Sequence, residues 1–392
     1  MLGRTREIAG AANRAESLHS FGAAYPVADL PIAATESAVK LFYILTFHIQ
    51  TIYKRLVARK KWYRKILYRL SIAVFYFFYG LRCLIPPAVF CWVSRPFLRL
   101  FILFAIPKKR ILRNLTAAFG KCYSDASKDG LARGVQDHFR ENLLDCLLQL
   151  ANPEYVRRSI SVSGIEHLES ALKNGQGAIA LGAHIGNFVL LGTRIGLEGH
   201  AVHTLFRIPR DRTVEKIIKR FLPHYHQSVI PSLTKRIAVK TILDALRRNE
   251  IVHILGDNLK NGRINVLLFG HRVLSSRGPV SLALRSGAPL VPMYLIRNYH
   301  GRMQLVIEPP IELTLTGDLA TDIAQNTRRV ISHLEALIRR YPDQWSWLTV
   351  RLNKGNFVHL QEPTPRQSSY KNTIANERTQ QAQSIFKMPT GR

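Results

Sequence analysis

The sequence predicts an α/β fold, in which a largely parallel β-sheet is flanked by helices and preceded by an apolar N-terminal membrane segment. Short apolar runs bounded by Gly, Pro or charge recur between residues 178 and 308, and segments with helical periodicity separate them. Alternation of this kind is typical of a parallel sheet covered by helices. Residues 70–106 form the most apolar stretch of the chain and follow a dense run of positive charge, which predicts the membrane segment.

Composition divides the 392 residues into four segments. Residues 1–38 mix small residues with scattered charge, lack the apolar core of a secretory signal, and are expected to form a loosely ordered extension. Residues 39–107 are the basic and apolar membrane-associating segment, and residues 108–360 form the α/β domain. Residues 361–392 are rich in Gln, Ser, Thr, Asn and Pro, so we expect a disordered tail.

Positive charge greatly exceeds negative charge, since 56 Lys and Arg residues against 26 Asp and Glu give a net charge of +30. Such an excess indicates an anionic partner, which could be nucleic acid, an acidic membrane surface or an acidic protein. Eight Lys and Arg residues lie between positions 54 and 69 without one acidic residue, and four more lie at 108–113. Because these runs flank the apolar stretch, they favour a membrane surface, and nucleic acid is not an expected partner. A solvated basic helix is the alternative for 54–69.

The apolar stretch 70–106 is too long for one simple span, because about 20 residues cross a bilayer. Pro86 and Pro87 break a helix near its middle, and Arg82, Arg95 and Arg99 interrupt it. Both flanks are basic, which favours keeping both on the cytoplasmic side. We therefore expect a shallow hairpin or an interfacial helix pair rather than a single crossing.

The elements of the α/β domain follow from apolar runs and periodicity. The sequence 131–151 has apolar residues at three- and four-residue steps, which predicts a long helix before the sheet. The predicted strands are 178–183, 201–206, 251–255, 289–296 and 303–308. The other predicted helices are 211–222, 234–248, 278–287 and 320–340.

Several enzyme and metal classes are excluded by missing motifs. Cys83, Cys91, Cys122 and Cys146 form no Cys-x-x-Cys pair, so neither a zinc site nor a disulfide framework is expected, and a reducing compartment is the default. The glycines of the segment 175–180 precede a strand instead of following one, which predicts a turn rather than a dinucleotide site. The chain has no P-loop and no nucleophile elbow, and no cofactor or metal is expected.

The strongest candidate for a catalytic residue is His184, which directly follows the predicted strand 178–183. Open parallel sheets bind their ligands at the carboxyl ends of the strands. A neutral imidazole there can accept a proton from a hydroxyl group, because its ordinary pKa is about 6.5. Gly186 and Asn187 follow and lead into a helical run, which places Asn187 at the same edge as a candidate substrate contact.

Five sequence blocks resemble, in order and approximate spacing, the bacterial lipid A biosynthesis acyltransferase family, the lauroyl/myristoyl-type enzymes. The resemblance covers roughly residues 108–352 and implies a glycerolipid-acyltransferase-like fold. It also implies transfer of a fatty acyl chain from a thioester, usually on acyl carrier protein, to a hydroxyl of a lipid A precursor, at the cytoplasmic side of the bacterial inner membrane. The blocks are HIGNF at 184–188, FRIPRD at 206–211, LGDN at 255–258, the run 269–298 and YPDQWSWL at 341–348.

The resemblance implies roles for individual residues. His184 matches the family's general base, and Asp257 matches the aspartate of the third block. Arg207 matches an arginine that could hold a phosphate or a developing oxyanion, while an ordinary surface position is the alternative. Arg277 matches the loop before a helix that opens at Gly278, where backbone N–H groups suit a phosphate.

The sequence departs from the family pattern at Val189, where the family has Glu or Asp five positions after the histidine. Asp257 is the best candidate to replace that acid, whereas Glu198 is expected at the far end of the following helix.

Two functions are alternatives to acyl transfer onto a lipid A precursor. The protein could be an acyltransferase that acts on another glycerophospholipid or glycolipid, or a catalytically silent lipid-binding relative. For Trp345 and Trp347, plain core packing is the expectation.

Overall fold

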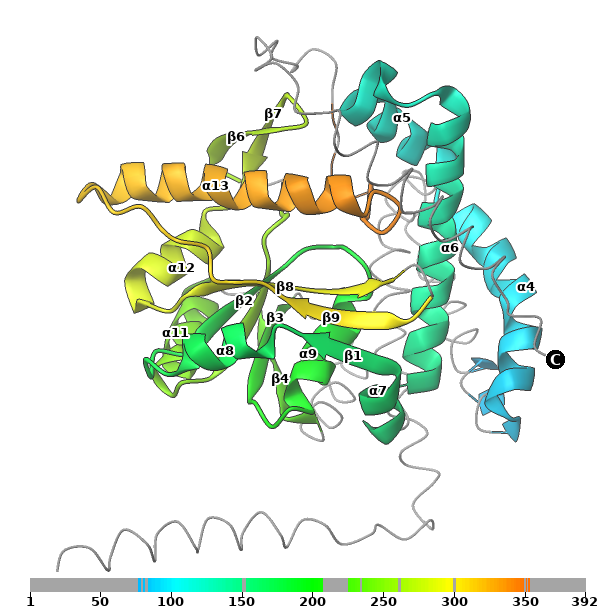
Figure 1. The fold of residues 1–392 in the computed structure, drawn as a ribbon, viewed down its shortest axis with the longest axis horizontal. Helices are drawn as coiled ribbons and strands as arrows, with labels where there is room; N and C mark the ends of the chain where they lie inside the picture. The colour runs from blue at the N-terminus through cyan, green and yellow to red at the C-terminus, as the bar shows by residue number, and fades with distance from the viewer. Residues whose placement is uncertain are drawn as a thin grey trace, which may run out of the picture.

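A seven-stranded sheet forms the centre of the computed structural model (Figure 1), in the order β1-β9-β8-β2-β5-β3-β4. The structure describes residues 77–352 apart from 79, 82–83, 150–152, 207–224, 233–234, 260–261, 299–300, 349 and 351. The five neighbouring strands from β8 to β4 are parallel, β9 runs antiparallel to β8, and β1 is parallel to β9. The prediction of a largely parallel sheet flanked by helices is therefore confirmed.

The central strands coincide with the five predicted apolar runs. Strand β2 is buried at every position, as a strand covered on both faces should be. These strands are β2 (Ala178–Gly182), β3 (Val202–Phe206), β5 (Ile251–Leu255), β8 (Leu290–Arg297) and β9 (Met303–Ile307).

Four further strands were missed because their sequences alternate or are short. The edge strands β1 (Ile160–Ser163) and β4 (Gln227–Pro231) each bury only one or two residues. A separate antiparallel hairpin joins β6 (Ile264–Leu268) to β7 (His271–Ser275). Both turn residues of this hairpin have positive φ, +50° at Phe269 and +73° at Gly270. The sequence gives no sign of this turn at Phe269, because residues other than glycine seldom adopt positive φ.

The described helices agree with four of the predicted ones. These are α6 (Asp125–Gln149), α11 (Lys235–Arg247), α12 (Gly278–Ser286) and α13 (Leu319–Arg340). Helix α6 begins six residues before its predicted start, and the Ser124 hydroxyl accepts a hydrogen bond from the Ser127 N–H there. The predicted helix 211–222 lies outside the described residues. The remaining helices are α4 (Pro87–Ala105), α5 (Lys108–Phe119), η2 (Gly120–Cys122), α7 (Pro153–Ser159), α8 (Ile165–Leu172) and α9 (Phe188–Gly196).

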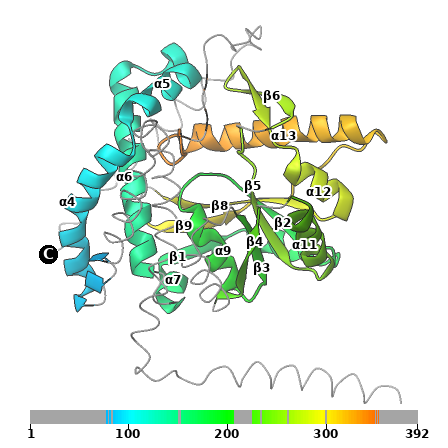
Figure 2. The same ribbon diagram turned by 180° about the vertical axis from the view of Figure 1, so that it is seen from behind.

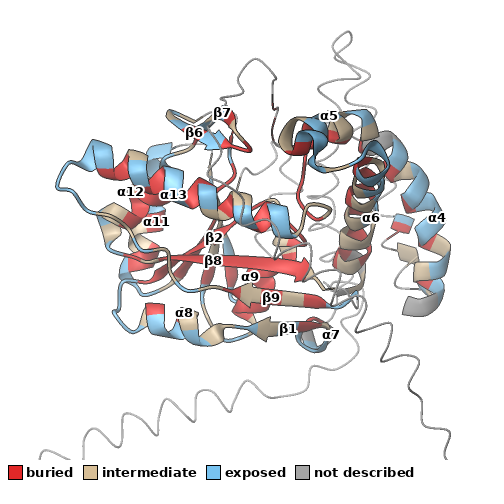
Figure 3. Cartoon of the chain, turned by 45° about the horizontal axis from the view of Figure 1, so that its top comes forward, coloured by how far each residue is buried: buried red, intermediate tan, exposed pale blue. Residues whose placement is uncertain are grey.

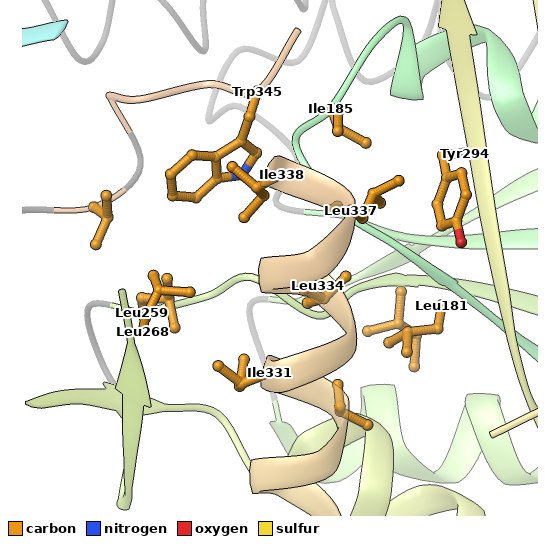
Figure 4. Close-up of a cluster of buried hydrophobic side chains, with 14 of the residues drawn as sticks. Leu181, Ile185, Leu259, Leu268, Tyr294, Ile331, Leu334, Leu337, Ile338 and Trp345 are labelled. Carbon is orange, nitrogen blue, oxygen red and sulfur yellow. The ribbon is translucent and has the colours of Figure 1, made fainter. Parts of the chain in front are cut away.

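Alternate residues of β2 enter two hydrophobic cores on opposite faces of the sheet. Ile179 and Leu181 pack with α11, α12 and α13, whereas Ala178 and Ala180 pack with α8 and α9. Figure 4 shows Leu334 and Leu337 of α13 beside Leu181. Figure 2 shows the molecule from the β3 and β4 edge of the sheet, with α9 and α11 on either side of these strands. On the α8–α9 side β2 contributes only alanines, whereas β8 contributes the larger Met293 and Leu295.

Helix α6 lies along the carboxyl ends of the central strands, with α4 on its outer side (Figure 3). Helix α4 buries Phe90 and Leu98, while Trp92 and Phe97 are exposed, at 78 % and 60 %. No single described helix is both long and apolar enough to cross a bilayer; the bent pair Val89–Leu103 and Lys108–Cys122, at 67°, meets the length and composition only when taken together. The predicted extension 1–38, the basic run 54–69 and the tail 361–392 lie outside the described residues.

Candidate active site

His184 and Asp257 come from neighbouring strands that end at the same edge of the sheet. Strand β2 ends at Gly182 and strand β5 at Leu255, and these two residues are register partners in a parallel pair. His184 and Asp257 each follow their strand by two residues. The two side chains therefore meet at the carboxyl edge, where open α/β sheets bind ligands.

The carboxylate of Asp257 accepts three hydrogen bonds. His184 Nδ1 lies 2.7 Å from Oδ1, the backbone N–H of His184 donates to Oδ2 at 2.9 Å, and the indole Nε1–H of Trp345 also donates to Oδ2, at 2.9 Å. The side chain of Asp257 is 1 % exposed and that of His184 is 13 % exposed. The acid is thus fixed and dry, while the imidazole retains access to the surface.

Ionisation of this pair follows from its surroundings. Burial acts to raise the pKa of Asp257, but the charge and hydrogen bonds of His184, together with the Trp345 hydrogen bond, hold it below the ordinary value. An ionised carboxylate accepts the proton of Nδ1, which leaves the lone pair on Nε2. The arrangement suits a general base that acts through Nε2.

The loop after His184 is held by hydrogen bonds to the segment 344–346 and to the end of β8. Ile185 forms an antiparallel bridge with Trp345, and the Ser346 N–H donates to the His184 carbonyl at 2.8 Å. Gly186 has φ +53°, and a Cβ at this position would lie 1.9 Å from the Leu295 carbonyl oxygen. Only glycine fits this turn.

Both tryptophans are fully buried, so the expected core packing is confirmed. Trp345 also has a role at the site that the sequence reasoning missed, because its N–H bonds the Asp257 carboxylate. The general requirement that a buried indole N–H find a partner was the available signal. The Trp347 N–H donates instead to the Pro342 carbonyl, at 2.6 Å.

Helix α9 begins beside the imidazole, and its first N–H groups have no cap from Asn187. The Phe188 ring lies 5.0 Å from the His184 ring. Asn187 is buried and turned toward α6, where its Nδ2 donates to the Asn142 carbonyl at 3.3 Å and its Oδ1 accepts from Cys146 Sγ at 3.6 Å. The first N–H groups of a helix lack intrahelical partners and attract negative charge. Substrate binding by the Asn187 side chain stays a prediction, and its contacts in the structure are with α6.

Val189 is the second residue of α9 and packs against the core on the α8–α9 side. The position of the family's acid is therefore apolar, and the acid that contacts His184 comes from the segment after β5. Glu198 pairs with Arg194 at the far end of α9, as the sequence predicts.

Of the two arginines predicted to bind substrate, the structure describes Arg277 but not Arg207. Arg277 is exposed at the position before α12. The other end of α12 lies at the amino end of β2, because a Cβ on Gly287 would lie 2.3 Å from Gln176 Oε1. The end of α12 that carries Arg277 is therefore the one toward the edge that carries His184. Arg207 directly follows β3 but lies outside the described residues. Substrate contacts of both arginines stay predictions.

His253 of β5 lies under the site and was not predicted. It is 2 % exposed, and its Nε2 has no hydrogen-bond partner. Gly182 makes room for it, since a Cβ there would lie 2.6 Å from His253 Nε2. Burial, and then the nearby His184, lower the pKa of His253 to about 4, so the ring is neutral at cellular pH. Among the described residues, no group of three or more His, Cys, Asp or Glu residues could hold a metal ion.

Comparisons with known proteins identify the family of this chain. The family described as bacterial lipid A biosynthesis acyltransferase matches residues 57–354. The chain is 26 % identical over 193 residues to a phosphatidylinositol mannoside acyltransferase of Mycobacterium tuberculosis, which covers 48 % of this chain and 58 % of that protein. It is 24 % identical over 247 residues to the protein of the same description from Mycolicibacterium smegmatis, covering 61 % and 78 %. The chain thus spans somewhat more than half the length of the M. tuberculosis relative. Since the family match extends over most of the sequence and includes the whole His184 and Asp257 site, this chain belongs to the bacterial lipid A biosynthesis acyltransferase family.

Proposed function

We propose that the protein transfers a fatty acyl chain from a thioester donor to a hydroxyl group of an anionic lipid, with His184 as general base. The observation that carries this proposal is the 2.7 Å contact between His184 Nδ1 and the buried Asp257 carboxylate at the carboxyl edge of the sheet. An imidazole whose Nδ1–H is held by a carboxylate can accept the proton of a hydroxyl group at Nε2.

The chemistry can be written as one acyl transfer. His184 Nε2 takes the proton of the acceptor hydroxyl as its oxygen attacks the thioester carbonyl carbon. The C–S bond then breaks, and the imidazolium returns the proton to the departing thiolate. Asp257 stabilises the imidazolium in between, and the first N–H groups of α9 offer hydrogen bonds to the developing oxyanion.

A lipid A precursor is the first candidate for the acceptor, supported by the family description. A phosphatidylinositol mannoside or similar glycolipid is the second, supported by the acceptor of the mycobacterial relatives. Both acceptors carry phosphate, which Arg277, at the position before α12, and Arg207, after β3, would bind. Acyl carrier protein is the proposed donor, with coenzyme A as the alternative.

The proposed place of action is the cytoplasmic side of the bacterial inner membrane. The exposed apolar side chains of α4 support contact with a bilayer, because such large groups are costly to leave in water. They are Val89, Trp92, Phe97, Leu100 and Leu103. The positive runs that flank this region would add attraction to anionic headgroups.

The competing function is that of a catalytically silent lipid-binding relative, which Val189 favours because it replaces the family's acid. The contact of Asp257 with His184 favours the active enzyme, because it supplies an acid that the sequence pattern lacks.

The test is acyl transfer by membranes that contain the wild-type protein, His184→Ala or the control His167→Ala on α8. Radiolabelled acyl groups are presented on acyl carrier protein or on coenzyme A, with a lipid A precursor or a phosphatidylinositol mannoside as acceptor. We expect labelled product from wild type and the control and none from His184→Ala. Equal transfer by His184→Ala would contradict the mechanism, and no transfer by wild type in any combination would contradict the function. Mass spectrometry of lipids from a deletion strain identifies the acceptor by its missing chain.

A further inference from the structure

Helix α6 contacts the loop that carries His184 from outside the sheet. Asn142 Nδ2 donates to the Gly186 carbonyl oxygen at 2.8 Å, and the Asn142 carbonyl accepts from Asn187 Nδ2 at 3.3 Å. We propose that Asn142 is a positioning residue for His184, acting through the Gly186–Asn187 peptide. This inference rests on the proposed role of His184 as general base.

The peptide between Gly186 and Asn187 is held on both of its sides. Its carbonyl accepts from Asn142, and its N–H donates to the Leu295 carbonyl at 2.7 Å. These opposed bonds fix the plane of the peptide, and with it the direction in which α9 leaves the loop. Because Phe188 of α9 packs edge-on against the His184 ring, the orientation of this peptide also determines the packing of the imidazole.

The helix that carries Asn142 is itself fixed to the sheet. Asp145, nearly one turn further along α6, pairs with Arg297 at the end of β8. The Arg297 N–H donates to Gln344 Oε1 at 2.9 Å, and the Gly186 N–H donates to the Gln344 carbonyl at 3.0 Å. Helix α6, the end of β8 and the segment 344–346 therefore form a closed frame around the loop.

The frame makes the effect of Asn142 specific to His184. Loss of its hydrogen bond frees one side of the peptide while Asp257 still holds Nδ1, so the ring can tilt about that contact. A shift of about 1 Å in a reacting group costs about 100-fold in rate. The expected loss is therefore in kcat, with KM little changed.

Gln136 provides a matched control on the same helix. Its Nε2 donates to the Ile106 carbonyl at 2.8 Å, which is a bond of the same type and length as that of Asn142. Gln136 is buried, whereas Asn142 is half-buried. Its partner belongs to the segment between α4 and α5 and not to the catalytic loop. Gln136→Ala thus removes comparable stability without touching the loop.

The test compares Asn142→Ala and Asn142→Asp with Gln136→Ala in thermal unfolding and in kcat, KM and the pH profile of acyl transfer. We expect about a 10- to 100-fold lower kcat for both Asn142 variants, a displaced acid limb of the pH profile, and near wild-type kinetics for Gln136→Ala at a similar loss of stability. Wild-type kcat in the Asn142 variants, or equal kinetic losses in all three variants, would overturn the proposal.

A second readout does not depend on turnover. In ¹⁵N-histidine NMR spectra of the resting protein, we expect the His184 resonances to shift in Asn142→Asp and to stay unchanged in Gln136→Ala. Unchanged His184 signals in Asn142→Asp would reject positioning even if wild type transferred acyl groups. An inactive wild type with shifted signals would instead reject the proposed function and keep the positioning.

Discussion

Asp257 holds His184 at two points: Oδ1 lies 2.7 Å from the imidazole Nδ1, and Oδ2 accepts the backbone N–H of the same residue at 2.9 Å. The acid therefore fixes the ring and the strand end that carries it with one carboxylate. The two residues are 73 positions apart in the chain, whereas the family pattern places the acid five positions after the histidine. The segment after a neighbouring strand thus supplies the carboxylate that position 189 lacks.

Restoring the family's acid should then bring no gain. In Val189→Glu, a carboxylate replaces a side chain that packs on the core, so we expect lower stability and acyl transfer at or below the wild-type rate. The measurement is initial rate together with unfolding in urea. A rate well above wild type would show that Asp257 does not serve as the acid.

Removal of the Trp345 N–H should weaken the acid without removing it. In Trp345→Phe the Asp257 carboxylate loses one of its hydrogen bonds, which raises its pKa and lowers the free energy of unfolding by about 1.5–3 kcal/mol. We expect the acid limb of the pH profile of kcat to move to higher pH. The control is Trp347→Phe, which loses a bond to the Pro342 carbonyl at similar burial and should keep the wild-type profile. Identical profiles in both variants would argue against a role for Trp345 at the site.

Glycine is required at position 186 by a close contact as well as by its backbone angle. Gly186→Ala would bring a Cβ within 1.9 Å of the Leu295 carbonyl oxygen, while Gly175→Ala, at a similar φ of +71°, meets nothing within 4 Å. We expect about 1–2 kcal/mol of lost stability for Gly175→Ala from the backbone alone, with activity kept. Gly186→Ala should lose more stability and most activity. Equal losses in urea unfolding would show that the contact is unimportant.

The buried His253 predicts a pH dependence of stability. Its pKa is about 4 in the folded protein and about 6.5 when unfolded. Between these values the unfolded state binds the extra proton, so stability falls as the pH drops from 6.5 to 4, by about 3 kcal/mol in all. His253→Asn should flatten this part of the curve, whereas His226→Asn, at an exposed site, should not. A wild-type slope in His253→Asn would show that another group is responsible.

Sequence patterns predicted the central strands because β2 and β5 are almost fully buried and read as continuous apolar runs. Strands β1 and β4 were missed because edge strands keep polar residues on the exposed face. The hairpin of β6 and β7 was missed because its turn places Phe269 at positive φ.

The site could be predicted in part. His184 was found because it follows an apolar strand, and Asp257 through the family resemblance; parallel pairing of β2 and β5 then brings their side chains together. The roles of Trp345 and Asn142 depend on segments that approach the loop from 161 and 42 positions away, and no local pattern encodes such contacts. His253 was missed because, in the sequence, it is one polar residue within an apolar strand.

The central claim is that Asp257 orients the general base His184 and stabilises its charged form. The most direct measurement is kcat/KM of Asp257→Asn as a function of pH. The control is Asp322→Asn, a buried carboxylate of α13 that accepts hydrogen bonds from Thr316. Loss of the orienting carboxylate in a serine-protease triad lowers turnover about 10⁴-fold. We expect a loss approaching about 10⁴-fold for Asp257→Asn, with both proteins folded and Asp322→Asn retaining wild-type turnover. A folded Asp257→Asn protein within about tenfold of wild type at every pH, a barrier change of no more than about 1.4 kcal/mol, would contradict the account.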